Sequence, residues 1–369
     1  MMKSVQNEIY CPLMWQQVAT TTEGNFRPCC NFQWQEKNEE SHFSQGWNNI
    51  KDVLNPFKEQ MNKSIKIKEC NYCWDLESKG QDSTRTIALR YMENTTDTIK
   101  RIDYKLGNLC NLGCRMCEPF SSSVLQNEIL NNADIEWLQA DKESANYDYN
   151  KRTWFVTALE QALEFPEIDT MKFTGGEPFS IPEVQDFLKQ FPRKETTEVQ
   201  FVTNALLIND KRIELLKKFK RVHLTVSCDG IEDLYEYIRW PGKWEKFESK
   251  YLQLVNEGFD ITVGITVSAF NIYYMPEILD YFYKKDQQLN LIFVTVPWHF
   301  QPWVFPEHLK DKIKDKFKKY LHLVDRYKEI LAHETDFDES NYKRFLEQKL
   351  IKDKLRKQEL DIFGELSGK

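Results

Sequence analysis

The chain has 369 residues and a mass of 44.1 kDa, enough to bury about three-quarters of its surface without covalent cross-links. Hydrophobic residues make up 41% and charged residues 29%, which excludes a disordered or fibrous protein. The 50 Lys and Arg residues face 57 Asp and Glu residues, so the net charge of −7 gives no overall attraction to nucleic acid or to an anionic membrane. No apolar run has the length of a signal peptide or a transmembrane helix. We therefore expect a cytoplasmic protein with no membrane partner, whose nine cysteines stay reduced.

Residues 1–95 are predicted to form a cysteine-rich N-terminal module. They show no alternation of strand and helix patterns, and five of the nine cysteines fall among them. Turn-forming residues such as Gly24 and Asn25 indicate loops between short elements.

Residues 96–300 carry the pattern of an α/β fold, because short β-rich runs alternate there with helical patterns. The predicted strands are Arg101–Leu106, Thr170–Thr174, Glu198–Thr203, Arg221–Ser227, Asp260–Ser268 and Asn290–Val296. The predicted helices are Ser121–Leu130, Thr153–Glu164, Pro182–Gln190, Asp210–Lys220, Trp244–Glu257 and Pro276–Lys284. Six strand–helix units in series predict a parallel sheet with right-handed crossovers, curled into a full or partial (β/α)6 barrel. The polar segment Asn131–Arg152 is predicted to be an inserted loop.

Residues 301–369 are predicted to form a helical C-terminal extension. Within it, residues 306–358 have the pattern of two amphipathic helices. The apolar positions of the first helix recur at spacings of three, four or seven, at Leu309, Ile313, Phe317, Leu321, Val324 and Leu331. The lysines between them are interpreted as a solvated face.

The strongest chemical signal is a CxxxCxxC motif just beyond the first barrel strand, formed by Cys110, Cys114 and Cys117. Three thiolates within eight residues can converge on one metal centre from a single loop. A 4Fe–4S cluster normally takes four thiolates, so three would leave one iron open for chemistry. A structural zinc site is the alternative, although closed zinc sites use four ligands.

A second motif, Gly175-Gly176-Glu177-Pro178, follows the second predicted strand. Ligands of barrel-like α/β folds bind at the carboxyl ends of the strands. Adjacent glycines let the backbone approach a ligand, Glu177 offers an acceptor for an ammonium group, and Pro178 stiffens the exit. An ordinary turn is the alternative interpretation.

Together the two motifs resemble the radical S-adenosylmethionine (SAM) superfamily over roughly residues 100–300. By this resemblance, Cys110, Cys114 and Cys117 hold a 4Fe–4S cluster, and Met116 is the apolar residue near the adenine. Gly175, Gly176, Glu177 and Pro178 match the element that holds the amino group of SAM.

Further elements of the same resemblance follow along the chain. Ser227 and Asp229 match an SxDG element near the SAM ribose and carboxylate, and Arg239 matches an arginine that pairs with that carboxylate. Asn204 matches a third-strand TNG element in which this chain has Ala205 instead of glycine.

The N-terminal cysteines suggest a second metal site. Cys70 and Cys73 form a CxxC pair whose sulfurs can reach one metal, and Cys11 with Cys29 or Cys30 could complete four ligands. The segment from Gly24 to Cys30 resembles a step of the SPASM and twitch auxiliary-cluster modules, which in most members follow the barrel. This resemblance implies an auxiliary 4Fe–4S cluster and favours Cys29 over Cys30, with a structural zinc site as the alternative.

The remaining candidates are weaker. Cys228, in a predicted strand, is interpreted as a small buried hydrophobic residue. His223 is interpreted as a core residue, whereas His299 lies at the predicted catalytic rim together with the aromatic residues Trp298, Trp303 and Phe305.

The resemblance implies an enzyme that reductively cleaves SAM to a 5′-deoxyadenosyl radical and abstracts hydrogen from a substrate. It also implies an electron donor such as flavodoxin or ferredoxin. A peptide or protein side chain is the first choice of substrate, and a small molecule or nucleotide is the alternative; we expect no nucleic-acid partner. A non-catalytic iron–sulfur or zinc scaffold is the alternative from another class.

Overall fold

The computed structural model describes residues 9–35, 39–42, 50–92, 97–135, 145–146, 148, 153–165 and 167–364. The chain divides into two compact units. The first comprises Met1–Leu109, Asp148–Phe201 and Asp210–Val222, and the second comprises Cys110–Tyr147, Val202–Asn209 and His223–Lys369. None of the helices in the described part of the chain is both long and apolar enough to span a membrane.

The protein is an α/β protein with an eight-stranded, mostly parallel sheet of order β2-β1-β3-β4-β5-β6-β7-β8. The β1–β2 pair is antiparallel, whereas β1–β3, β3–β4, β4–β5, β6–β7 and β7–β8 are parallel. The strands are β1 Gln17–Thr20, β2 Phe26–Arg27, β3 Arg101–Leu106, β4 Thr170–Gly175, β5 Glu198–Thr203, β6 Arg221–Ser227, β7 Asp260–Val267 and β8 Gln288–Phe293. The six predicted strands correspond to β3–β8, so this part of the prediction is confirmed.

The α-helices alternate with these strands from β3 onward. They are α1 Leu13–Gln16, α2 Ile50–Asn62, α3 Asn71–Ser78, α4 Thr84–Tyr91, α5 Ser123–Asn131, α8 Thr153–Glu164, α9 Pro182–Gln190, α10 Asp210–Leu216, α11 Glu232–Ile238, α12 Trp244–Asn256, α13 Met275–Tyr283, α14 Glu307–Phe317, α15 Val324–Leu331 and α16 Glu339–Arg356. The six helices predicted between the strands are present. The sequence reading missed α11, and most of the predicted loop Asn131–Arg152 lies outside the described residues.

In the first unit, the sheet follows the period of two that β-strands impose on side chains. Tyr104, Phe173 and Phe201 are partners in register on β3, β4 and β5, and their rings stack at centroid distances of 5.3 and 5.1 Å. The Tyr104 hydroxyl donates to the carbonyl of Ala158 on α8, so this apolar face is covered by helix. The neighbouring register positions point to the opposite face.

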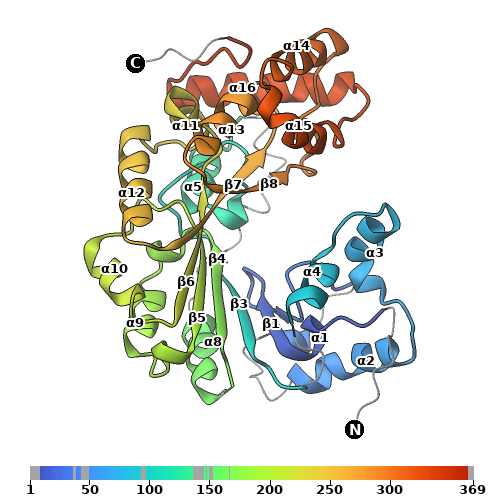
Figure 1. The fold of residues 1–369 in the computed structure, drawn as a ribbon, viewed down its shortest axis with the longest axis vertical. Coiled ribbons are helices and arrows are strands. Elements are labelled where there is room, and N and C mark those ends of the chain that lie inside the picture. Colours follow the sequence, from blue (N-terminus) through green and yellow to red (C-terminus); the bar gives the residue numbers. More distant parts are fainter. Residues whose placement is uncertain are drawn as a thin grey trace. The chain divides into compact units, whose positions relative to one another are not determined.

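The N-terminal residues of the first unit contain α1–α4, drawn from dark blue to cyan in Figure 1, and contribute β1 and β2 to the sheet. β1 lies parallel to β3, with Gln17 opposite Arg101. The order α1-β1-β2-α2-α3-α4 has no regular strand–helix alternation, as predicted, but the sequence analysis did not identify β1 and β2. The signal was missed because β1 has only four residues and β2 two.

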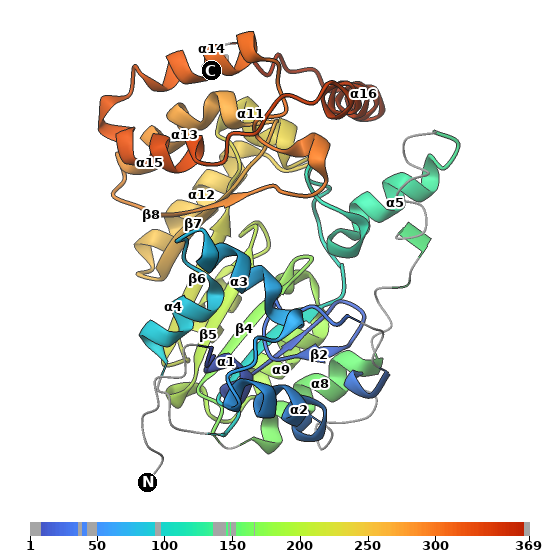
Figure 2. The ribbon, with the colours of Figure 1, turned by 90° about the vertical axis from the view of Figure 1, so that its right-hand side faces the viewer.

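The C-terminal residues of the second unit form three helices, α14–α16 (Figure 2), so the prediction of two helices is wrong. The predicted apolar stripe is interrupted after Phe317, where α14 ends, and Leu321 is 82% exposed. The break lets the chain turn so that the ring of Phe317 stacks on that of Tyr327 at 4.9 Å. A periodicity count cannot detect such a turn, because the residues on either side remain helical.

Candidate active site

The loop with Cys110, Cys114 and Cys117 follows β3 and belongs to the second unit, and all three side chains are half-buried. The Cys110 N–H donates to Ser123 Oγ at 3.2 Å. The Cys117 N–H donates to the Cys114 carbonyl at 3.0 Å. The Leu112 N–H points at Cys110 Sγ at 3.4 Å, a contact that a thiolate would accept. The loop is thus held by its own hydrogen bonds.

The same loop is hydrogen-bonded to the end of α11 and to the segment that follows it. The Gly113 N–H donates to the Trp240 carbonyl at 2.7 Å, and the Arg115 N–H donates to the Ile238 carbonyl at 2.9 Å. These two bonds bracket Arg239, the arginine that the sequence assigned to the SAM carboxylate. The structure therefore brings Arg239 and the cysteine loop together.

The cysteine loop has the donors that a metal cluster requires. Burial raises the pKa of Cys117 to about 12. Burial also raises the pKa of Cys114, and the positive charges of Arg239 and Arg356 partly offset that rise. Metal coordination deprotonates such thiols outright. Among the described residues, no three His, Cys, Asp or Glu side chains converge as they would around a single ion. A 4Fe–4S cluster binds each thiolate through a different iron, so it does not need that convergence.

Arg239 is buried and pairs with Asp229, whose other carboxylate oxygen accepts from the Thr266 N–H at 2.7 Å. Asn271 supports this pair, since its Nδ2 donates to the Asp229 carbonyl at 2.9 Å. The Nε of Arg239 is buried and finds no hydrogen-bond partner within the described ranges. An unpaired buried donor is costly, so this nitrogen is suited to an anionic ligand such as a carboxylate.

Tyr235 is a candidate site residue that the sequence analysis did not identify. It lies on α11, its hydroxyl is buried, and no partner for that hydroxyl occurs among the residues described. Its charged neighbours include Arg239, Cys114 and Asp229. No motif covers position 235; only the prediction of α11 itself could have directed attention to it.

Asn204 connects the end of β5 to the cysteine loop. Its Nδ2 donates to Asn111 Oδ1 at 2.8 Å, and its own Oδ1 accepts from the Leu206 N–H at 3.1 Å. The next residue, Ala205, has a φ of 64°, a left-handed conformation that favours glycine. Position 205 therefore has a conformation that a glycine, as in the TNG pattern, would adopt with less strain than alanine. Ser227, the last residue of β6, is half-buried in the same unit.

The Gly175–Pro178 motif belongs to the first unit, and its glycines serve the packing of the chain against itself. A methyl group on Gly176 would lie 2.2 Å from the Leu109 carbonyl oxygen, and Gly175 has a φ of 122°. The Glu177 N–H donates to that same Leu109 carbonyl at 2.7 Å. The requirement for glycine at position 176 thus comes first from backbone packing, which the sequence interpretation in terms of a ligand did not foresee.

The Glu177 side chain is 1% exposed and accepts from the Phe179 N–H at 3.1 Å. Pro178 begins a short turn of 3₁₀ helix and is also buried. Met116 is half-buried in the cysteine loop of the second unit.

In the first unit, the N-terminal cysteines differ in burial: Cys11, Cys29 and Cys73 are buried, Cys70 is half-buried and Cys30 is exposed. Burial, with a smaller contribution from the charge of Cys73, raises the pKa of Cys11 to about 12. Burial also raises the pKa of Cys29, and the charges of Cys30, Cys11 and Cys70 act in the same direction. Burial and the charges of Cys11 and Cys73 raise the pKa of Cys70.

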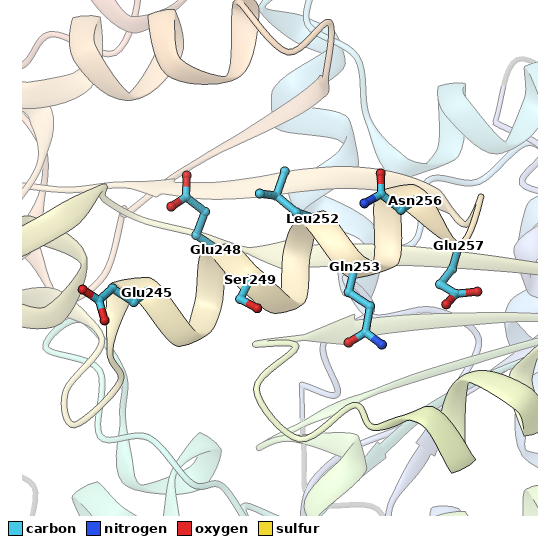
Figure 3. A pocket seen from close by; sticks show the side chains of 7 residues that line it. All are labelled: Glu245, Glu248, Ser249, Leu252, Gln253, Asn256 and Glu257. Carbon is cyan, nitrogen blue, oxygen red and sulfur yellow. The ribbon is translucent and has the colours of Figure 1, made fainter.

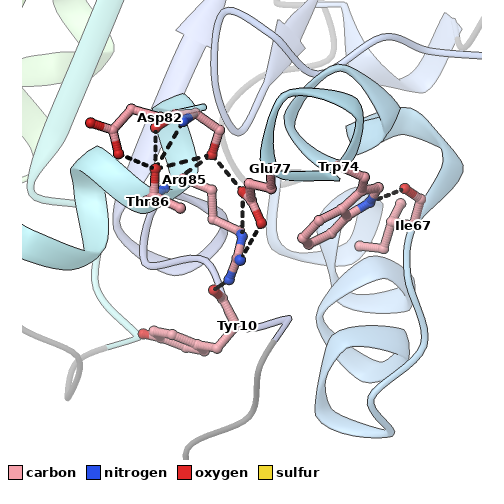
Figure 4. Close-up of polar contacts among 8 residues, drawn as sticks. Tyr10, Ile67, Trp74, Glu77, Asp82, Arg85 and Thr86 are labelled. Carbon is pink, nitrogen blue, oxygen red and sulfur yellow. Dashed lines mark hydrogen bonds and ion pairs between the residues drawn. The ribbon is translucent and has the colours of Figure 1, made fainter. Parts of the chain in front are cut away.

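Arg85 of α4 contacts the segments that carry Cys11 and Cys73 (Figure 4). Its Nε donates to Glu77 of α3 at 3.0 Å, and its Nη1 donates to the Tyr10 carbonyl at 2.9 Å. Its guanidinium also stacks on Trp74, next to Cys73, at 4.9 Å. One buried cation thus joins α3, α4 and the residue that precedes Cys11.

The weaker candidates are mostly packing residues. His299 is buried, its Nε2 lies 2.8 Å from Gln348 Oε1, and burial lowers its pKa to about 4. Trp303 and Phe305 are buried, whereas Trp298 is 62% exposed. Cys228 is buried, as the sequence indicated. His223 lies 3.1 Å from Asp260 and is only half-buried.

An open depression of about 650 Å³ lies along α12 in the second unit, lined by Glu245, Glu248, Leu252 and neighbouring side chains of that helix (Figure 3). It contains none of the predicted site residues. One exposed helix face with glutamates is not by itself a ligand site.

Residues 104–281 match the family model described as the Radical SAM superfamily. This segment, just under half of the chain, is therefore similar to a radical SAM domain. It contains the cysteine loop, the Gly175–Pro178 motif and Arg239.

Three solved structures illustrate what the chain is similar to. Native anSMEcpe with bound AdoMet matches at 18% identity and a TM-score of 0.42, over 64% of this chain and 62% of that one. Streptococcus suis SuiB bound to S-adenosylmethionine matches at 13% identity and a TM-score of 0.40, over 84% and 69%. TYW1 with a lysine–pyruvate adduct matches at 17% identity and a TM-score of 0.31, over 57% and 69%.

The chain spans about three-fifths of the length of anSMEcpe. No curated protein sequence matches the chain.

Proposed function

We propose that the protein is a radical SAM enzyme. The observation that supports this proposal most strongly is the buried Arg239, whose Nε has no hydrogen-bond partner in the described part of the chain. The cysteine loop lies beside it, because the N–H groups of Gly113 and Arg115 donate to the carbonyls of the residues on either side of Arg239. Cys110, Cys114 and Cys117 would hold the cluster, and Arg239 would bind the carboxylate of SAM. When bound, the cluster and SAM supply one-electron cleavage of the sulfonium and hydrogen abstraction from a substrate.

The protein's own residues prepare this site. Asp229 and Asn271 fix Arg239, because the carboxylate pairs with the guanidinium while the amide holds the carbonyl of the same aspartate. Asn204 steadies the cysteine loop through Asn111. Glu177 is assigned to the amino group of SAM, and Met116 to the adenine, on the motif resemblance alone.

We further propose an auxiliary 4Fe–4S cluster held by Cys11, Cys29, Cys70 and Cys73. The charges of Cys11 and Cys70 act on Cys29, which supports placing these thiols in one ligand set. Cys29 is buried, as are Cys11 and Cys73, whereas Cys30 is exposed, and this difference supports Cys29 over its neighbour. Four protein ligands close the site, which favours electron relay over substrate binding. A closed zinc site is the alternative for the same ligands.

The proposed substrate is a peptide or protein side chain, by the resemblance to auxiliary-cluster enzymes, with a small molecule or nucleotide as the alternative. The reductant would be a flavodoxin or ferredoxin.

Anaerobic incubation of reconstituted protein with SAM and dithionite tests the proposal, with mass spectrometry of the products. We expect 5′-deoxyadenosine and methionine from the wild type and none from the Cys110→Ala, Cys114→Ala, Cys117→Ala triple variant. Arg239→Gln should keep its iron but bind SAM at least tenfold more weakly. Cys228→Ala is the matched control for loss of a buried thiol near the site. If the wild-type protein contains its full complement of iron and sulfide but neither binds nor cleaves SAM, the proposal is refuted and the non-catalytic scaffold is the remaining hypothesis.

A further inference from the structure

Helix α16 lies outside the matched segment 104–281 but within the second unit, and its charged residues are unusually buried. Lys352 is 3% exposed, Asp353 9% and Arg356 8%. Charged side chains are almost never buried to this degree unless they are paired. Lys352, Asp353 and Arg356 contact the cysteine loop or residues beside it, and Asp353 also pairs with Lys349 of α16 itself at 2.8 Å.

The first contact joins α16 to Arg115, the residue between Cys114 and Met116. The Arg115 side chain is 0% exposed, and its Nη2 pairs with Asp353 at 2.7 Å. Its guanidinium also stacks on Tyr237 at 3.6 Å, and the Tyr237 hydroxyl donates to Asp353 at 2.8 Å. Lys352 Nζ donates to the Arg115 carbonyl at 3.1 Å, which places an ammonium group against the backbone of the loop.

The second contact involves Arg356. Its Nε and Nη2 donate to the two carboxylate oxygens of Glu128 on α5, each at 2.7 Å. A methyl group on Gly113 would lie 3.5 Å from Arg356 Nη2, so the guanidinium touches the residue before Cys114. Its Nη1 is buried without a hydrogen-bond partner among the residues that the structure describes.

These contacts place two positive groups beside the cysteine loop. Arg356 touches Gly113, next to Cys114, and Lys352 donates to the carbonyl of Arg115, two residues before Cys117. Buried charges are screened by salt far less than surface charges.

We propose that α16 forms a charged wall of the SAM-cluster site, in which Lys352 and Arg356 position the cysteine loop and favour the reduced cluster. The inference rests on the proposed function and assigns a role to residues that no motif covers. Lys352 and Arg356 are positioning residues, since they act through the loop.

The sign of the effect follows from Coulomb's law. Reduction adds an electron to a cluster held by thiolates, and a nearby cation lowers the free energy of that added charge. The potentials of such clusters depend on net charge and hydrogen bonding around them. Removing Arg356 or Lys352 should therefore lower the midpoint potential. Removing Glu128, which pairs with Arg356, should raise it.

The test compares Lys352→Met, Arg356→Gln and Glu128→Gln in the full chain after anaerobic reconstitution. Lys354→Gln is the matched control, because Lys354 lies on the same helix but is exposed. Iron and sulfide are measured first, and the potential is then read by redox titration with electron paramagnetic resonance. The signal that changes on addition of SAM identifies the relevant cluster.

We expect lower potentials in Lys352→Met and Arg356→Gln, a higher potential in Glu128→Gln, and the wild-type value in Lys354→Gln. The inference would be overturned if all variants that contain the cluster had the same midpoint potential. It would also be overturned if the potentials of Arg356→Gln and Glu128→Gln shifted in the same direction. If Arg356→Gln takes up no iron, the opposite signs expected for Lys352→Met and Glu128→Gln still decide. A wild type without any SAM-responsive cluster would instead refute the proposed function.

Discussion

Replacing Asp353 by Asn should loosen the cysteine loop in the protein without any cluster. The side chains of Arg115 and Asp353 are 0% and 11% exposed, so the substitution leaves a buried guanidinium without its counter-charge. Removing one partner of a buried ion pair costs about 3 to 5 kcal/mol. We take the lower value, about 3 kcal/mol, because Arg115 keeps Gln358 and the ring of Tyr237 as partners.

Hydrogen exchange of the apo protein measures this cost locally. The N–H groups of Gly113 and Arg115 are bonded to the carbonyls of Trp240 and Ile238, so they exchange only when the loop opens. A loss of about 3 kcal/mol corresponds to exchange faster by on the order of 100-fold, at roughly tenfold for each 1.4 kcal/mol. Peptides covering the loop report this rate by mass spectrometry.

Two comparisons isolate the ion pair. Glu339→Gln removes an exposed partner of Lys343 on the same helix and should leave the loop unchanged. The double variant Arg115→Gln, Asp353→Asn should exchange more slowly than Asp353→Asn alone, because the unpaired charge is gone. Exchange in Asp353→Asn within threefold of the wild type would refute the reasoning.

Three other perturbations have outcomes that the structure defines. Gly176→Ala should lower the melting temperature strongly, because its methyl group would lie 2.2 Å from a backbone oxygen. Gly80→Ala should lower the melting temperature much less, because no atom lies within 4 Å of the added methyl group. Equal effects of the two substitutions would contradict the packing argument. Cys29→Ala should lose the N-terminal metal while Cys30→Ala retains it, as iron, sulfide and zinc analysis would show; the reverse result would reassign the ligand. Below pH 6.5 the unfolded chain protonates His299 while burial keeps the folded residue neutral down to about pH 4, so stability should fall through this window. Urea midpoints should fall less steeply with acid in His299→Asn, and an unchanged slope would argue against the buried neutral imidazole.

The strands β3–β8 were predictable because each is a short β-rich run bounded by helical patterns. The start of β6 at Arg221 and its end at Ser227 coincide with the prediction. β1 was missed because four residues carry too little periodicity. Its pairing with β3 joins residues that are far apart in the sequence, such as Gln17 and Arg101, so no local pattern indicates it. The α14 helix was extended too far because Leu321 fits the apolar spacing although it is exposed in the structure.

The candidate site was predictable where chemistry follows a local pattern, as in the cysteine loop. The contacts of that loop with α16 were not, because Lys352 and Arg115 are 237 residues apart and no spacing links them. Tyr235 carries no motif and lies on a helix that the sequence reading missed. Gly176 was noticed for its motif, but only the structure shows the Leu109 carbonyl that excludes a side chain there.

The reach of α16 has a practical consequence for expression. A fragment cut to residues 104–281, or to a boundary near residue 300, would keep every cysteine of the loop yet lose Asp353 and Arg356. Arg115 and Glu128 would then be left as opposite charges with no counterpart from α16. Such a fragment should be poorly soluble and should incorporate iron inefficiently, so a minimal recombinant version of the domain needs the chain at least as far as Gln358.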